Sequence, residues 1–444
     1  MTSTRILRLR QLLWLYFWLL LFEGALRRWF LPGLSNVLLL VRDPVALLAV
    51  WWAWPLLRQR RWYGWMLTLL VIGSLAFLMG VTLGHGDLFI AFYGVRVFLL
   101  QLPLIFVFAS VFTRDDVIRF AWVMVLLCIP MTLLIATQSN LPSSHLLNVG
   151  PGGLGTSVFA GAGGRFRPPG TFTFITGVSS FFTLAVASLF CVLYCHNNNQ
   201  RQKLICLIAG IALVVALPVS ISRSLLAGYL QVLTATVAAL LLSRTRIVPL
   251  LSGLLAVVLA IVIGSNIPAF KETSGAFLAR WDRAAGIDRE AAGDVGVAGH
   301  QLQNRVLAGY TKPLGDLDSV PLAGYGIGIG TNVGAQRLTG ELTFVVGERA
   351  WEASLKELGL PLGLTFLIWR VALTFFVLVM SLKAAVRGNR VPLILVGASF
   401  LDLLGGQLSQ PTGLGFIVIS SGLTLAGCNS SIAEKSYFSH RSFA

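Results

Sequence analysis

The chain has 444 residues, of which 56% are hydrophobic and only 12% are charged, with 34 Lys and Arg against 18 Asp and Glu. A soluble domain carries about 25% charged residues, so this composition excludes a soluble globular protein. Apolar runs of about 20 residues, long enough to cross a bilayer core, recur almost from end to end. The basic excess forms no block interleaved with aromatic residues, which argues against nucleic acid as a partner. We therefore expect a polytopic α-helical membrane protein.

About twelve spans are expected, all within a single integral membrane domain that covers residues 1–444. In chain order they are 12–26, 34–57, 65–83, 88–112, 117–137, 171–194, 204–219, 225–242, 247–267, 351–380, 391–408 and 413–428. Two connections are long. The first, 138–170, is rich in Gly and Pro, and the second, 268–350, is expected to be a large, partly helical loop between spans nine and ten.

About half of the 34 basic residues lie in alternate connections. These segments are 5–10, 58–61, 114–119, 201–203, 244–246, 383–390 and 435–441. Because short cytoplasmic loops carry an excess of Lys and Arg, both termini are predicted to be cytoplasmic and both long loops external. The first span continues into Glu23 and Arg27 without a small-residue cleavage site, so we expect an uncleaved anchor and not a signal peptide.

The other basic residues lie within spans or in the outer segments, where charge is expensive. An arginine at mid-bilayer costs about 2.5–3.5 kcal/mol, so it persists where it faces a polar cavity, a partner or a ligand. About half of these residues are expected to pair with internal acids, and the excess predicts an anionic ligand that arrives from outside. The guanidinium fork suits phosphate oxygens. The set comprises Arg27, Arg28, Arg42, Arg96, Arg223, Lys356 and Arg370 in spans, and Arg165, Arg167 and Arg349 in outer segments.

Three local patterns give narrower expectations. Arg42 and Asp43 precede a proline and do not face each other on a helix, so each is expected to find its partner on another span, as a clamp or within a site. Arg165 and Arg167 lie in a Gly/Pro-rich segment that either gates a cavity or is a solvated linker. The embedded Asp402 is expected to pair with Arg96 or Arg370.

The segment 323–331 reads Ala-Gly-Tyr-Gly-Ile-Gly-Ile-Gly-Thr and contains a GxGxG pattern. A dinucleotide-binding loop requires a preceding strand and a following helix in a βαβ unit, and neither is expected in this external loop. Glycines at this density instead predict a tight backbone that packs closely against its neighbours.

Three segments, taken in order, carry a family resemblance. Ile221-Ser222-Arg223-Ser224 begins a span, the glycine-rich stretch follows in the external loop, and the loop ends in 347–352, Gly-Glu-Arg-Ala-Trp-Glu, ahead of the Glu357-Leu358-Gly359 sequence. Their order and spacing over about 220–364 resemble the O-antigen polymerase and O-antigen ligase superfamily. The N-terminal half agrees in its span pattern and in 22–29, Phe-Glu-Gly-Ala-Leu-Arg-Arg-Trp.

The resemblance implies an all-α, GT-C-like membrane glycosyltransferase that works on the outer face of the bacterial inner membrane. Its donor would be an undecaprenyl-diphosphate-linked glycan, with no cofactor and no metal, and its partners in the cell would include a chain-length regulator and a flippase. In the family, the arginine of the Ser-Arg pair, here Arg223, and a loop arginine, here Arg280 or Arg305, hold the diphosphate. Further candidates for the donor or glycan are Arg349, Arg165, Arg167, Arg96 and Trp351.

The ligase branch carries a catalytic His nine residues before the Glu-x-Gly glutamate and a Tyr three residues after that His. Here those positions hold Glu348 and Trp351, which favours the polymerase branch with Glu348 as the candidate catalytic base. Glu348 could equally pair with Arg349 or Arg223 and do no proton chemistry. The alternatives are a ligase that transfers the glycan to lipid A core or protein, and a transporter or flippase of lipid-linked sugars.

Overall fold

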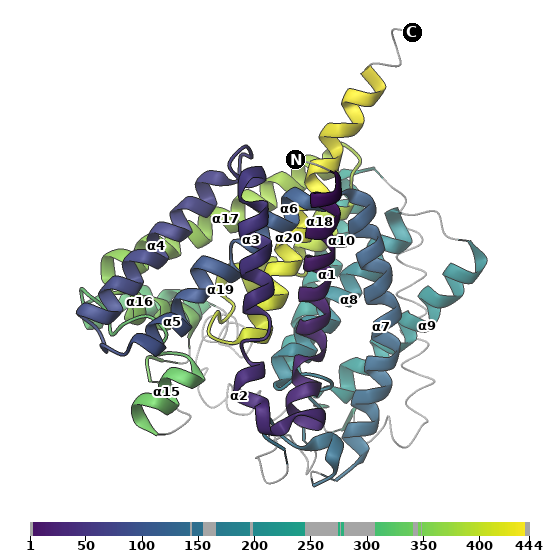
Figure 1. Cartoon of the computed structure of the whole chain (residues 1–444). Coiled ribbons are helices and arrows are strands. Elements are labelled where there is room, and N and C mark those ends of the chain that lie inside the picture. The colour runs from purple at the N-terminus through teal and green to yellow at the C-terminus, as the bar shows by residue number, and fades with distance from the viewer. Residues whose placement is uncertain are drawn as a thin grey trace, which may run out of the picture.

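The computed structural model describes residues 3–142, 144–153, 166–195, 199–244, 274–275, 277–278, 307–340, 345–347 and 349–439, with side chains as far as residue 429. All regular elements in these ranges are helices or helical turns, as expected (Figure 1). The helices are α1 (Ser3–Ala25), α2 (Ser35–Leu38), α3 (Asp43–Leu57), α4 (Tyr63–Thr82), α5 (Leu88–Arg96), α6 (Leu104–Val111), α7 (Arg114–Asn140), α8 (Ile175–Cys195), α9 (Gln200–Val219), α10 (Arg223–Leu242), α14 (Ala308–Gly315), α15 (Asn332–Thr339), α16 (Ala350–Leu358), α17 (Leu360–Val386), α18 (Val391–Val396), α19 (Phe400–Gly405) and α20 (Pro411–Ser439).

Ten helical segments of the described chain are long and apolar enough to cross a membrane. They are Thr4–Phe30, Pro32–Leu57, Tyr63–Thr82, Leu88–Val111, Arg114–Asn140, Ile175–Tyr194, Gln200–Val219, Arg223–Leu242, Leu360–Val386 and Pro411–Asn429. By helix length and hydropathy the chain is therefore a multi-pass membrane protein. Helical loop segments such as α14 and α15 agree with the expectation of a partly helical second loop.

Two of the roughly twelve expected spans are absent from this set. The predicted span 247–267 lies outside the described residues. The prediction for 391–408 is wrong, because this stretch forms two short helices, α18 and α19, that a bend at 397–399 separates. At the bend Gly397 packs so closely on α10 that a Cβ there would lie 2.7 Å from the Cα of Val232.

The tenth expected span also begins later than predicted. Gly359 has a φ of +79°, which ends α16 and separates it from α17. Pro361 then lies in the first turn of α17, where a proline is tolerated because its missing N–H has no helical partner. As a result Trp351 and Glu357 belong to α16, outside the span, and not to the membrane-crossing helix.

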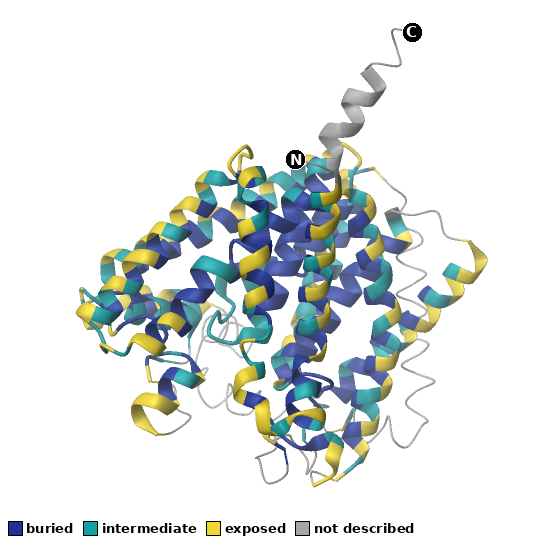
Figure 2. Ribbon diagram, in the orientation of Figure 1, coloured by how far each residue is buried: buried dark blue, intermediate teal, exposed yellow. Residues whose placement is uncertain are grey.

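The centre of the bundle is formed by α6, α18 and α20, which Figure 2 shows in the colour of buried residues. In the most apolar 18-residue window of the spans Leu88–Val111 and Pro411–Asn429, 83% of the residues are buried. The corresponding share is 33% in α4, α9 and α10. The less buried helices expose large apolar side chains such as Leu75 and Leu230. This arrangement suits a protein whose outer helices face lipid.

The N-terminus and several of the predicted basic connections meet at one end of the bundle. Arg10 in α1 binds Asp116 in α7 at 3.1 Å, and Arg61, between α3 and α4, donates to Asn429 of α20 at 3.1 Å. Asn389, which follows α17, donates to the carbonyl of Gly427 at 3.0 Å. These contacts bring four of the seven basic segments to one end of the bundle, and the full alternation and the assignment of this end to the cytoplasm stay predictions.

At the opposite end the buried Arg28 joins the end of the first span to two distant segments. Its guanidinium donates to the carbonyl oxygens of Leu147 (2.7 Å), Val149 (2.7 Å), Gly170 (2.9 Å) and Phe172 (2.9 Å). Main-chain carbonyls outside a helix have no internal partner, and one arginine satisfies four of them here. This arginine is therefore a structural clamp.

Replacing Arg28 by Met should destabilise the protein by about 2–3 kcal/mol, because the buried carbonyls of Val149 and Phe172 would lose their donor, whereas the other two carbonyls keep a hydrogen bond from Gln138. Thermal melting of the purified protein in detergent measures the change. The matched control is Arg58→Met, which alters an exposed arginine at the other end. Equal melting temperatures for the two variants would contradict the clamp.

Candidate functional site

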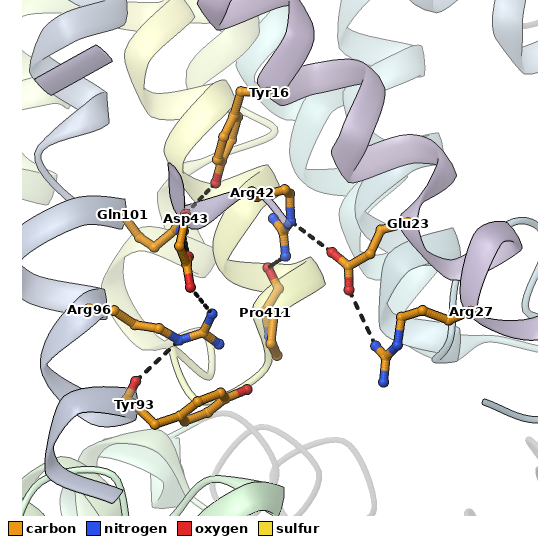
Figure 3. A network of polar contacts seen from close by, with 9 residues as sticks. All are labelled: Tyr16, Glu23, Arg27, Arg42, Asp43, Tyr93, Arg96, Gln101 and Pro411. Carbon is orange, nitrogen blue, oxygen red and sulfur yellow. Dashed lines mark hydrogen bonds and ion pairs between the residues drawn. The ribbon is translucent and has the colours of Figure 1, made fainter. Parts of the chain in front are cut away.

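A buried network of charges joins the first, second and fourth spans (Figure 3). The carboxylate of Glu23 binds Arg42 at 2.8 Å and Arg27 at 3.2 Å. Asp43 binds Arg96 at 2.8 Å and accepts a hydrogen bond from Gln101. The prediction that Arg42 and Asp43 find partners on other spans is confirmed.

More of the embedded arginines are engaged internally than the expected half. Arg27, Arg42 and Arg96 bind carboxylates, and Arg28 binds the four carbonyls above. Arg370 donates to the backbone oxygens of Asp402 (3.0 Å), Leu403 (2.5 Å) and Gly406 (2.5 Å) at the end of α19. The predicted pairing of Asp402 with Arg370 therefore runs through the main-chain carbonyl of Asp402. Because these arginines are bound within the protein, the cations that bind an anionic ligand are expected at other positions.

We expect Glu23→Gln to destabilise the protein by about 3–5 kcal/mol, because it removes the charge that balances two buried guanidinium groups. Glu352→Gln is the matched control, since Glu352 forms a partly exposed ion pair with Lys356 that is worth about 1 kcal/mol or less. Melting temperatures of the two variants in lipid nanodiscs test this difference. A loss for Glu23→Gln no larger than that for Glu352→Gln would refute the stabilising role of the network.

Three adjoining cavities lie away from the end that carries the N-terminus. The first has a volume of about 420 Å³ and is lined by Lys312, Arg349, Glu352 and Lys356, among others. Arg349 also lines a narrow second cavity of about 50 Å³. Gln407 lines both this second cavity and a third one of about 330 Å³. Shared lining residues thus connect the three in a row.

The first cavity has a positive net charge, because three cations and two carboxylates line it: Lys312, Arg349 and Lys356, with Asp316 and Glu352. Lys356 is paired with Glu352 at 2.8 Å, one turn away in α16. Lys312 comes from α14, and Arg349 immediately precedes α16. Within the described part of the chain neither Lys312 nor Arg349 has a carboxylate partner. These two cations are therefore the ones that an anion entering the cavity would meet.

The glycine-rich segment covers the second cavity. Gly328 packs directly on α5, where a Cβ on Gly94 would lie 2.5 Å from its backbone N, and its own φ is +93°. The predicted close-packed backbone is confirmed. The carboxyl group of Glu357 accepts a hydrogen bond from the backbone N–H of Gly330 at 2.6 Å, so α16 holds this segment in place.

Glu357, which lines the second cavity, has a clearly shifted pKa. Burial raises its pKa to about 7, and backbone hydrogen bonds from Gly330 and Gly328 offset this only in part. The group therefore changes its charge close to neutral pH, next to a cavity that Arg349 also lines. A carboxyl group tuned in this way is common in functional sites.

The Ser-Arg pair begins α10 next to the third cavity. Ser222 caps the helix by accepting a hydrogen bond from the N–H of Leu225, and Arg223 is the first helical residue. The hydroxyl groups of Ser222, Ser224 and Ser179 lie within 2.8–3.3 Å of one another. Ile221 has a φ of +48°, which is strained for a β-branched residue, and such strain is common at functional sites.

The site residues that the sequence predicts are only partly within the described chain. Glu348, Arg280, Arg305 and Arg165 lie outside it, and their assignments stay predictions. Arg349 lines two of the three cavities.

Four further predicted residues are described, and none of them lines the three cavities. Arg223 lies at the start of α10 and Arg167 is half-buried ahead of α8. Arg96 is held by Asp43. Trp351 is buried behind α16, where its Nε1–H donates to the carbonyl of Leu404 at 2.9 Å. The structure therefore brings Arg349 to the cavities, and keeps Trp351 in a packing position.

Sequence reasoning missed Lys312, Glu357 and Gln407 as residues of the site. Glu357 could have been found from the sequence, because it is the glutamate of the Glu-x-Gly sequence. Its raised pKa is a consequence of burial, which only the fold defines. No sequence pattern pointed to Lys312 or Gln407, since they reach the cavities from segments about 95 positions apart in the sequence.

Comparisons with protein-family models, with curated proteins and with solved structures find no match for this chain. Among the described residues, no group of three or more His, Cys, Asp or Glu side chains is placed to hold a metal ion. The expectation that no metal takes part stays a prediction.

Proposed function

We propose that this protein polymerises oligosaccharide repeat units that are carried on undecaprenyl diphosphate, on the outer face of the bacterial inner membrane. The observation that carries the proposal is the first cavity, where Arg349 and Lys312 lack carboxylate partners in the described chain. Such cations favour an anionic ligand, and the sequence resemblance supplies its identity.

The lipid diphosphate would bind with its phosphate oxygens on Arg349 and Lys312, with Lys356 beside them. A guanidinium group can donate two parallel hydrogen bonds to phosphate oxygens, and an ammonium group adds a point charge. Arg223, together with Arg280 or Arg305, completes the set of diphosphate-binding cations that the family resemblance implies. The first cavity is lined by residues of α14 and α16, which lie outside the spans, so the donor would be held at the membrane surface.

In the reaction, a hydroxyl oxygen of one repeat unit attacks the anomeric carbon of the next and forms the new glycosidic bond. The bond from that carbon to the diphosphate oxygen breaks, and the lipid diphosphate leaves with the electron pair. Fixed cations stabilise the negative charge that builds up on the leaving group. The acceptor hydroxyl passes its proton to a carboxylate, and Glu348 is the proposed base.

The test is an elongation assay with the purified protein and lipid-linked repeat units alone. We expect a ladder of products. A product that forms only after lipid A core or an acceptor protein is added would replace the proposal with a ligase. Movement of the lipid-linked unit across vesicles, without any new glycosidic bond, would replace it with a flippase.

Within that assay, Arg349→Ala should lower the rate of elongation about 100- to 1,000-fold, because one charge that stabilises the leaving group is lost. Arg337→Ala is the matched control, since Arg337 is paired with Asp87 at 2.6 Å and does not line the cavities. Glu348→Gln and Arg223→Ala should also impair elongation. If both leave it intact, the proposed roles of Glu348 and Arg223 are wrong.

The pKa of Glu357 gives a second, pH-dependent test. Below about pH 7 the carboxyl group is protonated and the positive charge of Arg349 acts undiminished; above it the carboxylate partly cancels that charge. The KM for the lipid-linked donor should therefore rise about fivefold between about pH 6 and about pH 8, as for an electrostatic effect of about 1 kcal/mol.

Glu357→Gln should keep the low KM at both pH values. Asp87→Asn is the control: hydrogen bonding by Arg337 lowers the pKa of Asp87, so it stays ionised over this range. The Asp87→Asn variant should keep the pH dependence of the unmodified protein. A Glu357→Gln variant that behaves in the same way would exclude Glu357 as the titrating group.

A further inference from the structure

The third cavity lies between the N-terminal halves of α8 and α10 and the segment from α19 to α20, and its wall combines apolar surface with a set of polar side chains. Its volume is about 330 Å³, within the range of small-molecule sites. Serine, threonine and glutamine side chains form much of its wall, although the chain as a whole is 56% hydrophobic. The polar lining residues are Thr176, Ser179, Ser180, Thr183, Ser224, Gln231, Asp402, Gln407 and Gln410.

Several of these groups already hold one another in position. Thr176 donates to the side-chain oxygen of Gln410 at 2.9 Å, and the amide of Gln410 donates to Gln407 at 3.0 Å. Ser179 and Ser224 belong to the serine cluster at the start of α10. Because these side chains are ordered by bonds from three different elements, the wall is preorganised and loses little freedom when a ligand binds.

Asp402 differs from the rest of the wall. Its main-chain carbonyl accepts from Arg370, whose charge also attracts the carboxyl group, but within the described chain that carboxyl group accepts no hydrogen bond and forms no direct ion pair. A carboxylate that is largely removed from water is expensive unless donors satisfy it. The cavity therefore offers an acceptor that an entering ligand would satisfy with its own donors.

The composition of the wall defines the ligand. Hydroxyl and amide groups both donate and accept, and a carboxylate accepts strongly, which matches a molecule that carries many hydroxyl groups. The wall has no Lys or Arg in its lining, so it does not select an anion. On these grounds we propose that the third cavity is a saccharide-binding subsite, with the carboxylate of Asp402 accepting hydrogen bonds from sugar hydroxyls.

This inference rests on the proposed function and deepens it. Ser224 lines the subsite and follows Arg223 directly in α10. Gln407 separates the subsite from the second cavity, which Arg349 lines. The subsite would hold a sugar of the glycan while the cations hold the diphosphate, so the two parts of one substrate would occupy adjoining cavities.

Protection of an introduced cysteine tests the subsite without any glycosyl transfer. Ala227 lines the cavity, and Ala227→Cys would be labelled with a small methanethiosulfonate reagent in the full-length protein in nanodiscs. Leu338→Cys, an exposed position on α15 outside the spans and outside the three cavities, is the control. The background carries Cys195→Ser, and the described native cysteines are buried.

The probes are glucose, galactose and N-acetylglucosamine at up to about 100 mM, which detects weak binding, and the free repeat-unit oligosaccharide released from its lipid by mild acid. Betaine at equal osmolarity controls for solvent effects, and exchange of sodium for choline tests for a cation site. At least one saccharide should slow the labelling of Ala227→Cys and leave that of Leu338→Cys unchanged.

In the Ala227→Cys background, Asp402→Ala should raise the half-protecting saccharide concentration about tenfold, as for the loss of a charged hydrogen bond. Asp402→Asn should have a smaller effect, since an amide oxygen still accepts. Absence of protection by every saccharide, or equal protection with and without the Asp402 carboxylate, would overturn the subsite, and protection by sodium would make it a cation site. Protection without any elongation activity would keep the subsite and reject the polymerase.

Discussion

The ion pairs between Glu23 and the two arginines Arg42 and Arg27 are the interaction on which the rest of the arrangement depends. Arg42 also donates to the carbonyl of Pro411 at 2.9 Å, at the first residue of the central helix α20. The first two spans are thereby tied to the helix that the others surround. Since charges in a bilayer need partners within the protein, this network holds the first turn of α20 against the first two spans.

The start of α20 in turn positions the candidate site. The segment from α19 to α20 carries Gln407 and Gln410, which line two of the three cavities. Arg370 binds the beginning of this segment by donating hydrogen bonds to the carbonyl oxygens of Leu403 and Gly406. The embedded arginines thus act on the site indirectly: they build the walls, and the cations proposed for the diphosphate lie beside them, outside the spans, on Arg349 and Lys312.

Charge in the candidate site changes along the row of cavities. The first cavity carries Lys312 and Arg349, the second carries Glu357 beside Arg349, and the third carries Asp402 among neutral groups. A substrate with an anionic end and a polyhydroxylated body would match this order. The same order explains how one chain could hold a lipid diphosphate and a sugar without placing the sugar among cations.

The sequence by itself determined the helical class, most of the spans and the alternation of basic connections, because these depend on the length and polarity of local segments. It also predicted that Arg42 and Asp43 would find partners on other spans. Only the tertiary structure decided which partners they have, that 391–408 bends at Gly397, and that α16 ends before the span. The cavities and the raised pKa of Glu357 likewise depend on side chains far apart in sequence, whose burial no local pattern encodes.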